Sequence, residues 1–285
     1  EFLYYNLSNR YHELRSESGG SGRAGLNLSI ISNLKINLPS LLEQKKISEI
    51  LRRIDISREL FFKKKASIEL AKVSTINRYI QNLNNQNSLK LSCKDLCKKI
   101  FVGIASSTSH AYVKSNGVPM LRNQNIKEKG IDTSDILQIN KSFANAQATR
   151  KLNTGDVITV RTGYPGTSAV VPSYFNGCHS FTTLISRINQ DIVIPHYYSV
   201  YLNSFEGKRQ IRKIQAGGAQ ENLNVSSLEK LKIRIPDFDE QMKLIKISNI
   251  FDSLINLMEM KILKFNNFKK ATCNELLSGR KRINI

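Results

Sequence analysis

The chain has 285 residues, 40% of them hydrophobic, and its 43 Lys and Arg against 23 Asp and Glu give a net charge of +20. No apolar run reaches the ~18–20 residues that a membrane span needs, and four unevenly spaced cysteines exclude a disulfide framework. We therefore expect a cytoplasmic protein of about two domains, with no metal or cofactor. The positive charge favours nucleic acid as a partner, because Lys and Arg displace counterions from phosphates; a Lys-rich proteome is the alternative explanation.

The chain repeats itself at a distance of 197 residues. Residues 26–55 and 223–252 align without a gap, with 12 of 30 positions identical. Solenoid repeats have periods of roughly 20–50 residues, so this spacing indicates two equivalent modules separated by a whole domain. Internal two-fold pseudo-symmetry of this kind suits two-fold partners such as duplex DNA or paired subunits.

Residues 1–25 resemble the segment that precedes the second repeat copy. Both segments have paired tyrosines, a basic helical stretch and paired glycines shortly before Leu-Asn. We interpret residues 1–25 as the C-terminal remnant of a domain whose body lies outside this chain. The absence of an initiator Met is consistent with a partial chain.

Each repeat copy predicts a strand, a proline and a long helix. Apolar residues alternate at positions 34, 36 and 38 and at 231, 233 and 235, as in β-strands. Pro39 and Pro236 follow, and then apolar residues recur at steps of three and four, which predicts helices of ~40 residues, about 60 Å long. Exposure of either apolar stripe to water is unfavourable, so we expect the two helices to cover each other as an antiparallel coiled coil. The predicted seam comprises Ile47, Ile50, Ile54, Phe61, Ile68, Ala71, Ile76, Tyr79 and Leu83 in the first copy, and Leu244, Ile247, Phe251, Leu254, Met258, Ile262, Phe265, Phe268, Thr272 and Leu276 in the second.

The stretch between the helices is rich in short β-like runs broken by Gly, Asn and Ser, followed by two helical segments near 195–205 and 208–215. It predicts a globular domain of mixed helix and sheet, and the whole chain is expected to be α+β. The predicted regions are the remnant (1–25), a first conserved strand and helix (26–88), the globular domain (89–222) and a second conserved strand and helix (223–285).

Motifs of catalysis are either missing or misplaced. The G-x-G-x-x-G at residues 20–25 lacks the preceding strand and following helix that a dinucleotide site requires. The acidic residues after Pro236 have no counterpart after Pro39, which argues against a nuclease. The chain has no phosphate-binding loop, no methyltransferase tetrapeptide and no paired histidines. We therefore expect no catalytic residue and no metal ligand.

Two polar loops of the globular domain are suited to reading DNA. Arg forks onto guanine and Asn or Gln onto adenine in the major groove, and a glycine-bent turn allows close backbone approach. Ordinary polar hairpin turns remain the alternative. The candidate DNA-binding residues are Arg122, Asn123, Gln124, Asn125, Lys127, Arg161, Thr162, Gly163, Tyr164 and Gln220.

The order strand, Pro-x₃-Glu-Gln-x₂-Ile or Leu, and long helix, carried twice around a variable domain, resembles the specificity subunit of type I restriction-modification enzymes. The central stretch is also similar to target recognition domains of that family, at Phe101-Val102-Gly103, 119–126, 155–163 and 217–223. The similarity covers essentially the whole chain. The family usually carries two recognition domains, whereas this chain carries one and a remnant.

The resemblance implies a non-catalytic DNA recognition subunit that reads one half of a split target. It implies two methyltransferase subunits bound on the conserved helices, and a restriction subunit joined through the complex. Two copies of this chain in a homodimer would supply two readers. The alternatives are a stand-alone sequence-specific DNA-binding protein and, disfavoured by the missing motifs, a fused methyltransferase. The base sequence recognised does not follow from these residues, because recognition loops diverge freely.

Overall fold

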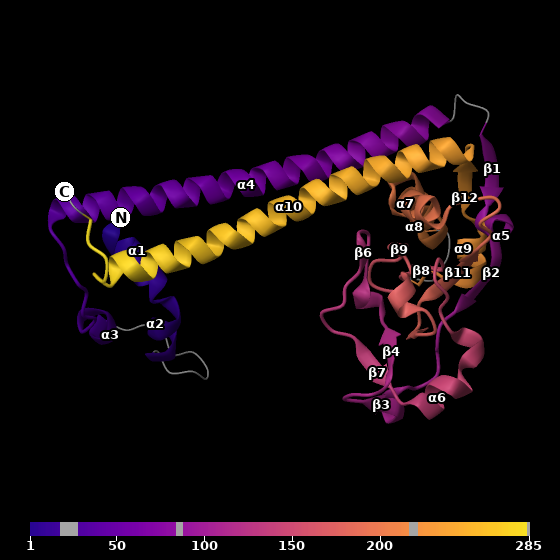
Figure 1. Cartoon of the computed structure of the whole chain (residues 1–285), viewed down its shortest axis with the longest axis horizontal. Coiled ribbons are helices and arrows are strands. Elements are labelled where there is room, and N and C mark those ends of the chain that lie inside the picture. Colours follow the sequence, from indigo (N-terminus) through magenta and orange to yellow (C-terminus); the bar gives the residue numbers. More distant parts are fainter. Residues whose placement is uncertain (18–27, 84–87, 217–221, 284–285) are drawn as a thin grey trace. The chain divides into compact units, whose positions relative to one another are not determined.

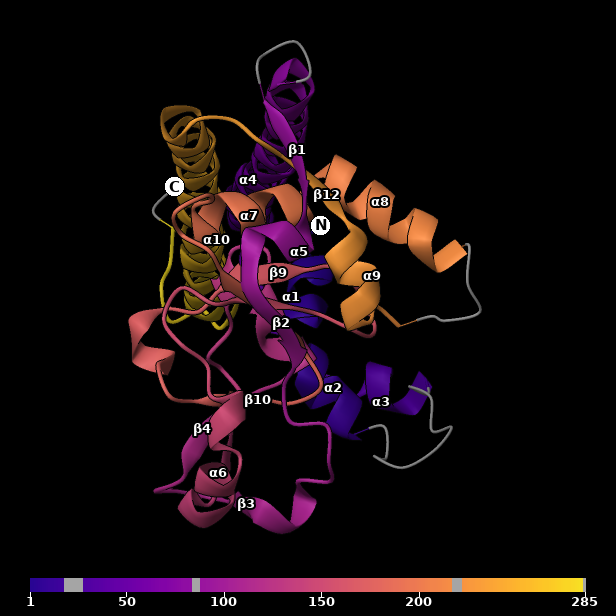
Figure 2. The ribbon, with the colours of Figure 1, turned by 90° about the vertical axis from the view of Figure 1, so that its right-hand side faces the viewer.

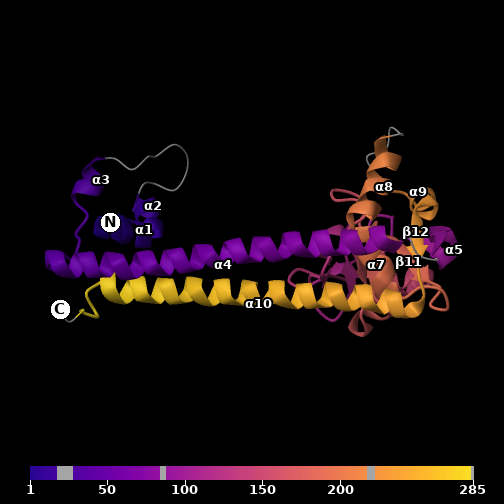
Figure 3. The same ribbon diagram turned by 90° about the horizontal axis from the view of Figure 1, so that it is seen from above.

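The computed structural model describes residues 1–17, 28–83, 88–216 and 222–283. Two long helices, α4 (Leu41–Asn82) and α10 (Phe238–Leu277), run side by side (Figure 3). The chain divides into two compact units, of which unit 1 contains residues 1–69 and 253–285 and unit 2 contains residues 70–252. The predicted α+β chain with two packed long helices is confirmed.

Unit 1 is helical in its described residues. Helices α1 (Phe2–Asn9), α2 (Tyr11–Glu17) and α3 (Leu28–Ser32) accompany the first part of α4 and the last part of α10. Aromatic residues of α1 are buried against both long helices, and this burial of apolar area stabilises the unit. The core consists of Phe2, Tyr5, Ile47, Leu51, Ile54, Cys273, Leu276 and Leu277.

Ion pairs show that the two long helices are antiparallel. In unit 1, Lys269 pairs with Asp55 at 2.5 Å and Lys65 with Glu259 at 3.1 Å, so numbering rises on one helix as it falls on the other. In unit 2, Lys72 pairs with Asp252 at 2.7 Å. Asp55 and Asp252 are 197 residues apart, and so are Lys72 and Lys269. The repeat in the sequence is therefore also a repeat of interhelical contacts.

The predicted seam is only partly correct. Ile50, Leu254 and Phe268 are 37%, 40% and 57% exposed, so they lie outside the buried stripe. The reason is that a helix has 3.6 residues per turn, and a stripe drawn at fixed steps of three and four drifts around its axis. Neighbouring positions such as Leu51 and Ile255 are buried instead.

Unit 2 is built on two four-stranded sheets. One sheet has the order β2-β11-β8-β9 and the other β10-β4-β7-β3, while β1 pairs with β12 and β5 with β6. In Figure 2 the β1–β12 pair lies near one end of the unit and β3, β4 and α6 near the other. The strands are β1 (Leu89–Ser92), β2 (Cys97–Val102), β3 (Tyr112–Val113), β4 (Val118–Leu121), β5 (Ile126–Lys127), β6 (Gly130–Ile131), β7 (Leu137–Ile139), β8 (Val157–Thr159), β9 (Ser168–Val170), β10 (His179–Ser180), β11 (Leu184–Ile188) and β12 (Lys232–Ile235).

Helices cover the first of these sheets. The helices of unit 2, besides its parts of α4 and α10, are α5 (Cys93–Leu96), α6 (Lys141–Ala146), α7 (Pro195–Asn203), α8 (Phe205–Ala216) and α9 (Val225–Lys230). Tyr197 and Tyr198 of α7 are completely buried in the main core, where the Tyr197 hydroxyl donates to the carbonyl of Arg234 at 2.6 Å. Large buried aromatics with a satisfied hydroxyl anchor α7 on the sheet. Figure 1 shows α7 beside β8 and β9.

The two repeat copies differ in the segment before the long helix, which is a strand only in the second copy. In the second copy β12 pairs with β1 in antiparallel register, Leu89 opposite Ile235 and Ser92 opposite Lys232. The strand predicted around residues 34–38 is wrong, since the structure assigns no strand there. Alternating apolar residues form a strand only beside a partner, and no described segment pairs with 34–38 as β1 pairs with β12.

The buried histidine of β10 predicts a pH dependence of stability. His179 is completely buried, and this burial lowers the pKa of its imidazole. The unfolded chain then binds the proton more readily, so stability present above the unfolded pKa of about 6.5 is lost as pH falls through it. We expect the free energy of unfolding to fall between about pH 7.5 and about pH 5, and expect His179→Gln to remove part of this fall. Urea unfolding checks this, with the exposed His12→Gln as control; equal pH profiles for wild type and H179Q would contradict it.

Candidate nucleic-acid interface

Two loops of unit 2 meet through the amide of Asn123. One loop follows β4 and contains residues 122–125, and the other joins β8 to β9. The Asn123 side chain donates to the Thr162 hydroxyl at 2.9 Å and accepts from the Arg161 backbone N–H at 3.3 Å. The structure thus brings together the two loops that the sequence singled out separately.

The β8–β9 loop is shaped by its glycines. Gly163 and Gly166 have φ of +85° and +95°, a region that side chains with a Cβ rarely adopt. A Cβ on Gly166 would also lie 2.2 Å from the Ile211 side chain of α8, so glycine permits the loop to pack on that helix. Tyr164, between the glycines, is 85% exposed. An exposed ring on a fixed turn can stack on a base or contact a sugar.

A hollow of about 800 Å³ opens beside both loops. Apolar residues such as Ile126 and Val160 contribute to its wall, and α8 contributes cations. Six of the predicted site residues take part. The lining residues are Asn123, Gln124, Ile126, Lys127, Glu128, Val160, Thr162, Gly163, Tyr164, Pro165, Thr167, Lys208, Ile211, Arg212 and Gln215.

The first loop is held by a turn that the sequence reasoning missed. The Arg122 guanidinium donates to the Asp135 carboxylate at 2.8 Å, and the Gln124 amide donates to the same oxygen at 2.9 Å. The turn itself is ordered by Asp132, whose carboxylate accepts from the Ser134 hydroxyl at 2.7 Å. This hydrogen bond lowers the pKa of the Asp132 carboxyl, so the turn keeps its negative charge.

The other predicted residues lie in different surroundings. Asn125 is 2% exposed, and its amide donates to the carbonyls of Asp132 and Asp135, so it holds the loop and has no surface for a base. Its choice as a base-contacting residue is therefore corrected. Arg161 does not line the hollow and is half-buried, whereas Lys127 lines it and is exposed. Gln220 lies outside the described residues.

Helix α8 adds positive charge that the list of candidate residues omitted. Lys208 pairs with Glu128 across the hollow, and Arg212 is exposed, with its guanidinium 5.8 Å from the Phe205 ring centre. The sequence already indicated a basic helix here. What it did not indicate was that α8 lies beside the two loops, because that proximity depends on the packing of Ile211 under Gly166.

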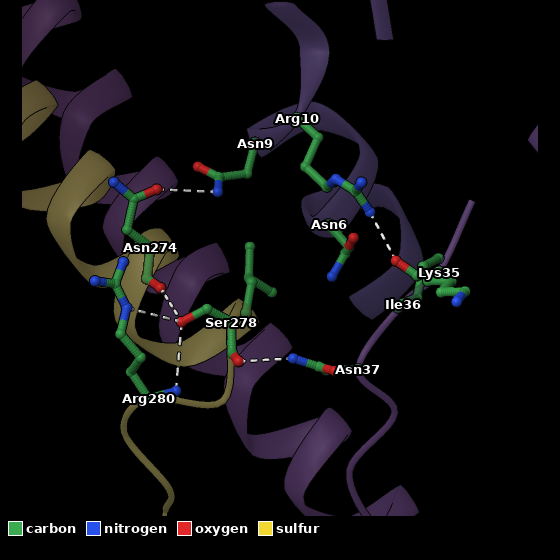
Figure 4. Close-up of a pocket in the computed structure, with 10 residues that line it drawn as sticks. Asn6, Asn9, Arg10, Lys35, Ile36, Asn37, Asn274, Ser278 and Arg280 are labelled. Carbon is green, nitrogen blue, oxygen red and sulfur yellow. Dashed lines mark hydrogen bonds between the residues drawn. The ribbon is translucent and has the colours of Figure 1, made fainter. Parts of the chain in front are cut away.

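A second hollow, of about 300 Å³, lies in unit 1 (Figure 4). Its polar groups are largely used within the unit. Arg10 donates to the Lys35 carbonyl at 2.8 Å, Asn9 to the Asn274 amide at 3.1 Å and Asn37 to the Ser278 carbonyl at 2.7 Å. We interpret it as the junction that fixes α1 to the end of α10.

The described residues offer little for other chemistry. Within them, no three His, Cys, Asp or Glu side chains gather as a metal site, and no helix is long and apolar enough to cross a membrane. Burial raises the pKa of the Cys93 and Cys178 thiols, which disfavours the reactive thiolate.

The family model described as the type I restriction modification DNA specificity domain matches residues 1–70 and 86–265. The match covers the sheets of unit 2 and most of both long helices. The chain belongs to this family, that of the specificity subunits of type I restriction-modification systems.

The chain is also similar to relatives whose curated names are those of type I specificity subunits. The type I restriction enzyme MjaVIII specificity subunit of Methanocaldococcus jannaschii is 23% identical over 319 residues, covering 99% of this chain and 70% of the relative. The putative MjaX specificity subunit of the same organism is 22% identical, covering 92% of this chain and 62% of the relative. The chain therefore spans about two thirds of the length of these relatives.

Solved structures show the same fold. A chain from a study of complex assembly and conformational transition of the type I R-M system superposes with a TM-score of 0.69 at 14% identity, covering 97% of this chain and 70% of that one. The S subunit from M. genitalium gives 0.58 at 13% identity, covering 97% and 72%. The HsdS subunit from Thermoanaerobacter tengcongensis gives 0.50 at 15% identity, covering 98% and 70%.

Proposed function

We propose that this chain is the non-catalytic DNA recognition subunit of a type I restriction-modification complex. In this proposal residues 89–222 form the recognition domain, and its two joined loops read one half of a split target. The observation that carries it is the hollow where amide, hydroxyl and aromatic side chains of both loops face the cations of α8. Polar groups supply base contacts, and cations hold phosphates.

The surface of α10 supports a role as a scaffold for methyltransferase subunits. In unit 1, Leu254, Leu257, Met260 and Leu263 are 39–61% exposed on this helix. Four large apolar side chains exposed within residues 254–263 favour a protein partner on this part of the helix. The proposed partners are two methyltransferase subunits, with the restriction subunit joining through the complex, in the cytoplasm where the DNA lies.

The experiment that tests this function is co-expression with methyltransferase subunits, followed by mapping of methylated bases. We expect the chain to co-purify with them, to direct methylation to a gapped motif, and to be inactive alone. A homodimer would give a gapped palindrome, because two-fold protein symmetry is mirrored in the site. A gapped asymmetric motif would show that a second, different recognition domain is used. Methylation or cleavage by the chain alone, or a continuous motif, would contradict the proposal.

A further inference from the structure

Asp135 forms four hydrogen bonds with three residues of the β4–β5 loop. Its carboxylate accepts from Arg122 at 2.8 Å and from Gln124 at 2.9 Å. Its backbone carbonyl accepts from Arg122 at 3.0 Å and from Asn125 at 2.8 Å. One residue, distant from the loop by ten positions or more, therefore fixes the side chains of two candidate readers.

The turn that carries Asp135 is attached to the loop at more than one point. The Asp132 backbone N–H donates to the Asn125 carbonyl at 2.7 Å, and the Asn125 amide donates back to the Asp132 carbonyl at 3.1 Å. Because Asn125 is buried, this attachment is protected from water. The position of Asp135 relative to Arg122 is thus set by the fold of the domain.

Arg122 is held in an orientation that leaves one of its side-chain nitrogens without a hydrogen bond. Its side chain is 23% exposed, and its Nε is buried without a hydrogen-bond partner among the described residues. A buried polar nitrogen left unpaired is costly and is uncommon in folded proteins. The ion pair with Asp135, whose side chain is 66% exposed, and the bond to the Asp135 carbonyl keep the guanidinium there.

We propose that Asp135 is a positioning residue for base recognition, an inference that rests on the proposed function. Its carboxylate fixes the Arg122 guanidinium and the Gln124 amide before DNA arrives, so that their remaining N–H and C=O groups are already directed for base edges. Fixing rotamer-rich side chains in advance lowers the entropy lost on binding. Its negative charge also repels phosphates, so it weakens binding to any duplex that offers no matching base contact.

The test compares Asp135→Ala with Asp191→Ala in the complex with methyltransferase subunits. Asp191 is a second exposed carboxylate of unit 2, and it lies neither in the two loops nor among the residues that line the hollow. The probes are a duplex bearing the motif found by methylation mapping, duplexes with each single base changed, and an unrelated duplex of equal length. Affinity for each duplex and the thermal unfolding midpoint are measured.

We expect Asp135→Ala to reduce discrimination roughly 5- to 150-fold at one or two base positions, the range typical of a base contact. Affinity for the unrelated duplex should rise, because a negative charge has been removed. Asp191→Ala should keep wild-type discrimination at every base position. In an Arg122→Ala background, Asp135→Ala should cause no further loss at the base that Arg122 reads. Asp135→Asn, which keeps one acceptor oxygen, should restore part of the discrimination.

Two outcomes would overturn the inference. One is wild-type discrimination in Asp135→Ala. The other is an equal loss of affinity for cognate and unrelated DNA together with a lower unfolding midpoint, which indicates a merely structural role. If the alanine variant does not fold, unchanged discrimination in Asp135→Asn overturns it instead. If the wild-type complex prefers no motif, the proposed function itself is wrong. If the wild-type complex prefers a motif and Asp135→Ala discriminates for it equally well, only this inference is wrong.

Discussion

Replacing Ile54 by Asp is expected to lower the free energy of unfolding by about 3 kcal/mol or more, because it places a charge in an apolar core without a partner. Ile54 is 7% exposed and packs in unit 1 with Phe2, Leu51 and Leu276. Phe251→Asp in unit 2 is expected to act in the same direction. Urea unfolding of the purified chain measures the change.

Ile56→Asp is the matched control for this prediction. Ile56 lies two residues further along the same helix and is 46% exposed, so the same change should stay within about 0.5 kcal/mol. The charge is identical in both variants, and only the burial differs. Equal stability of Ile54→Asp and wild type, with unchanged binding of methyltransferase subunits, would show that the helix packing is assigned wrongly.

The second large effect is expected in DNA recognition. Arg122→Ala and Arg161→Ala should each weaken binding of the cognate duplex by about 1–3 kcal/mol and relax the motif at one position. The reason is that an arginine that forks onto a base loses both hydrogen bonds when it is truncated. Binding assays on the cognate duplex and on singly substituted duplexes measure both effects.

Arg212→Ala provides the contrasting variant. Arg212 is exposed on α8 at the rim of the same hollow, where a phosphate contact is the expected role. Its removal should weaken all sequences alike and reduce the salt dependence of binding by about one phosphate contact. If Arg122→Ala and Arg161→Ala both leave motif and affinity unchanged, the reading loops lie elsewhere on the domain.

The repeat was sufficient to predict the long helices and their antiparallel pairing. Helical periodicity is a local property, and two apolar stripes in one chain have a strong reason to cover each other. Asp55 and Lys72 illustrate the limit of this argument. Their repeat was visible in the sequence, but their partners Lys269 and Asp252 were known only once the helices were in register.

The candidate loops likewise separate what the sequence predicted from what only the structure showed. The sequence indicated which loops carry arginines, amides and flexible glycines, since these residue types determine the possible contacts with DNA. It could not separate Asn125, buried and used within its loop, from Asn123, which joins the two loops. Both are asparagines in one short run, and only packing decides which amide faces solvent.

The sequence by itself determined the two long helices and their pairing, because these depend on local periodicity and on a repeat within the chain. Its motifs also resembled the family that the family model shows. Tertiary structure alone decided that Asp135 holds Arg122 and Gln124, that α8 lies beside the loops, and that residues 34–38 form no strand. Each of these depends on contacts between segments distant in sequence. Such contacts are set by the packing of whole elements, and a pattern of single residues does not record them.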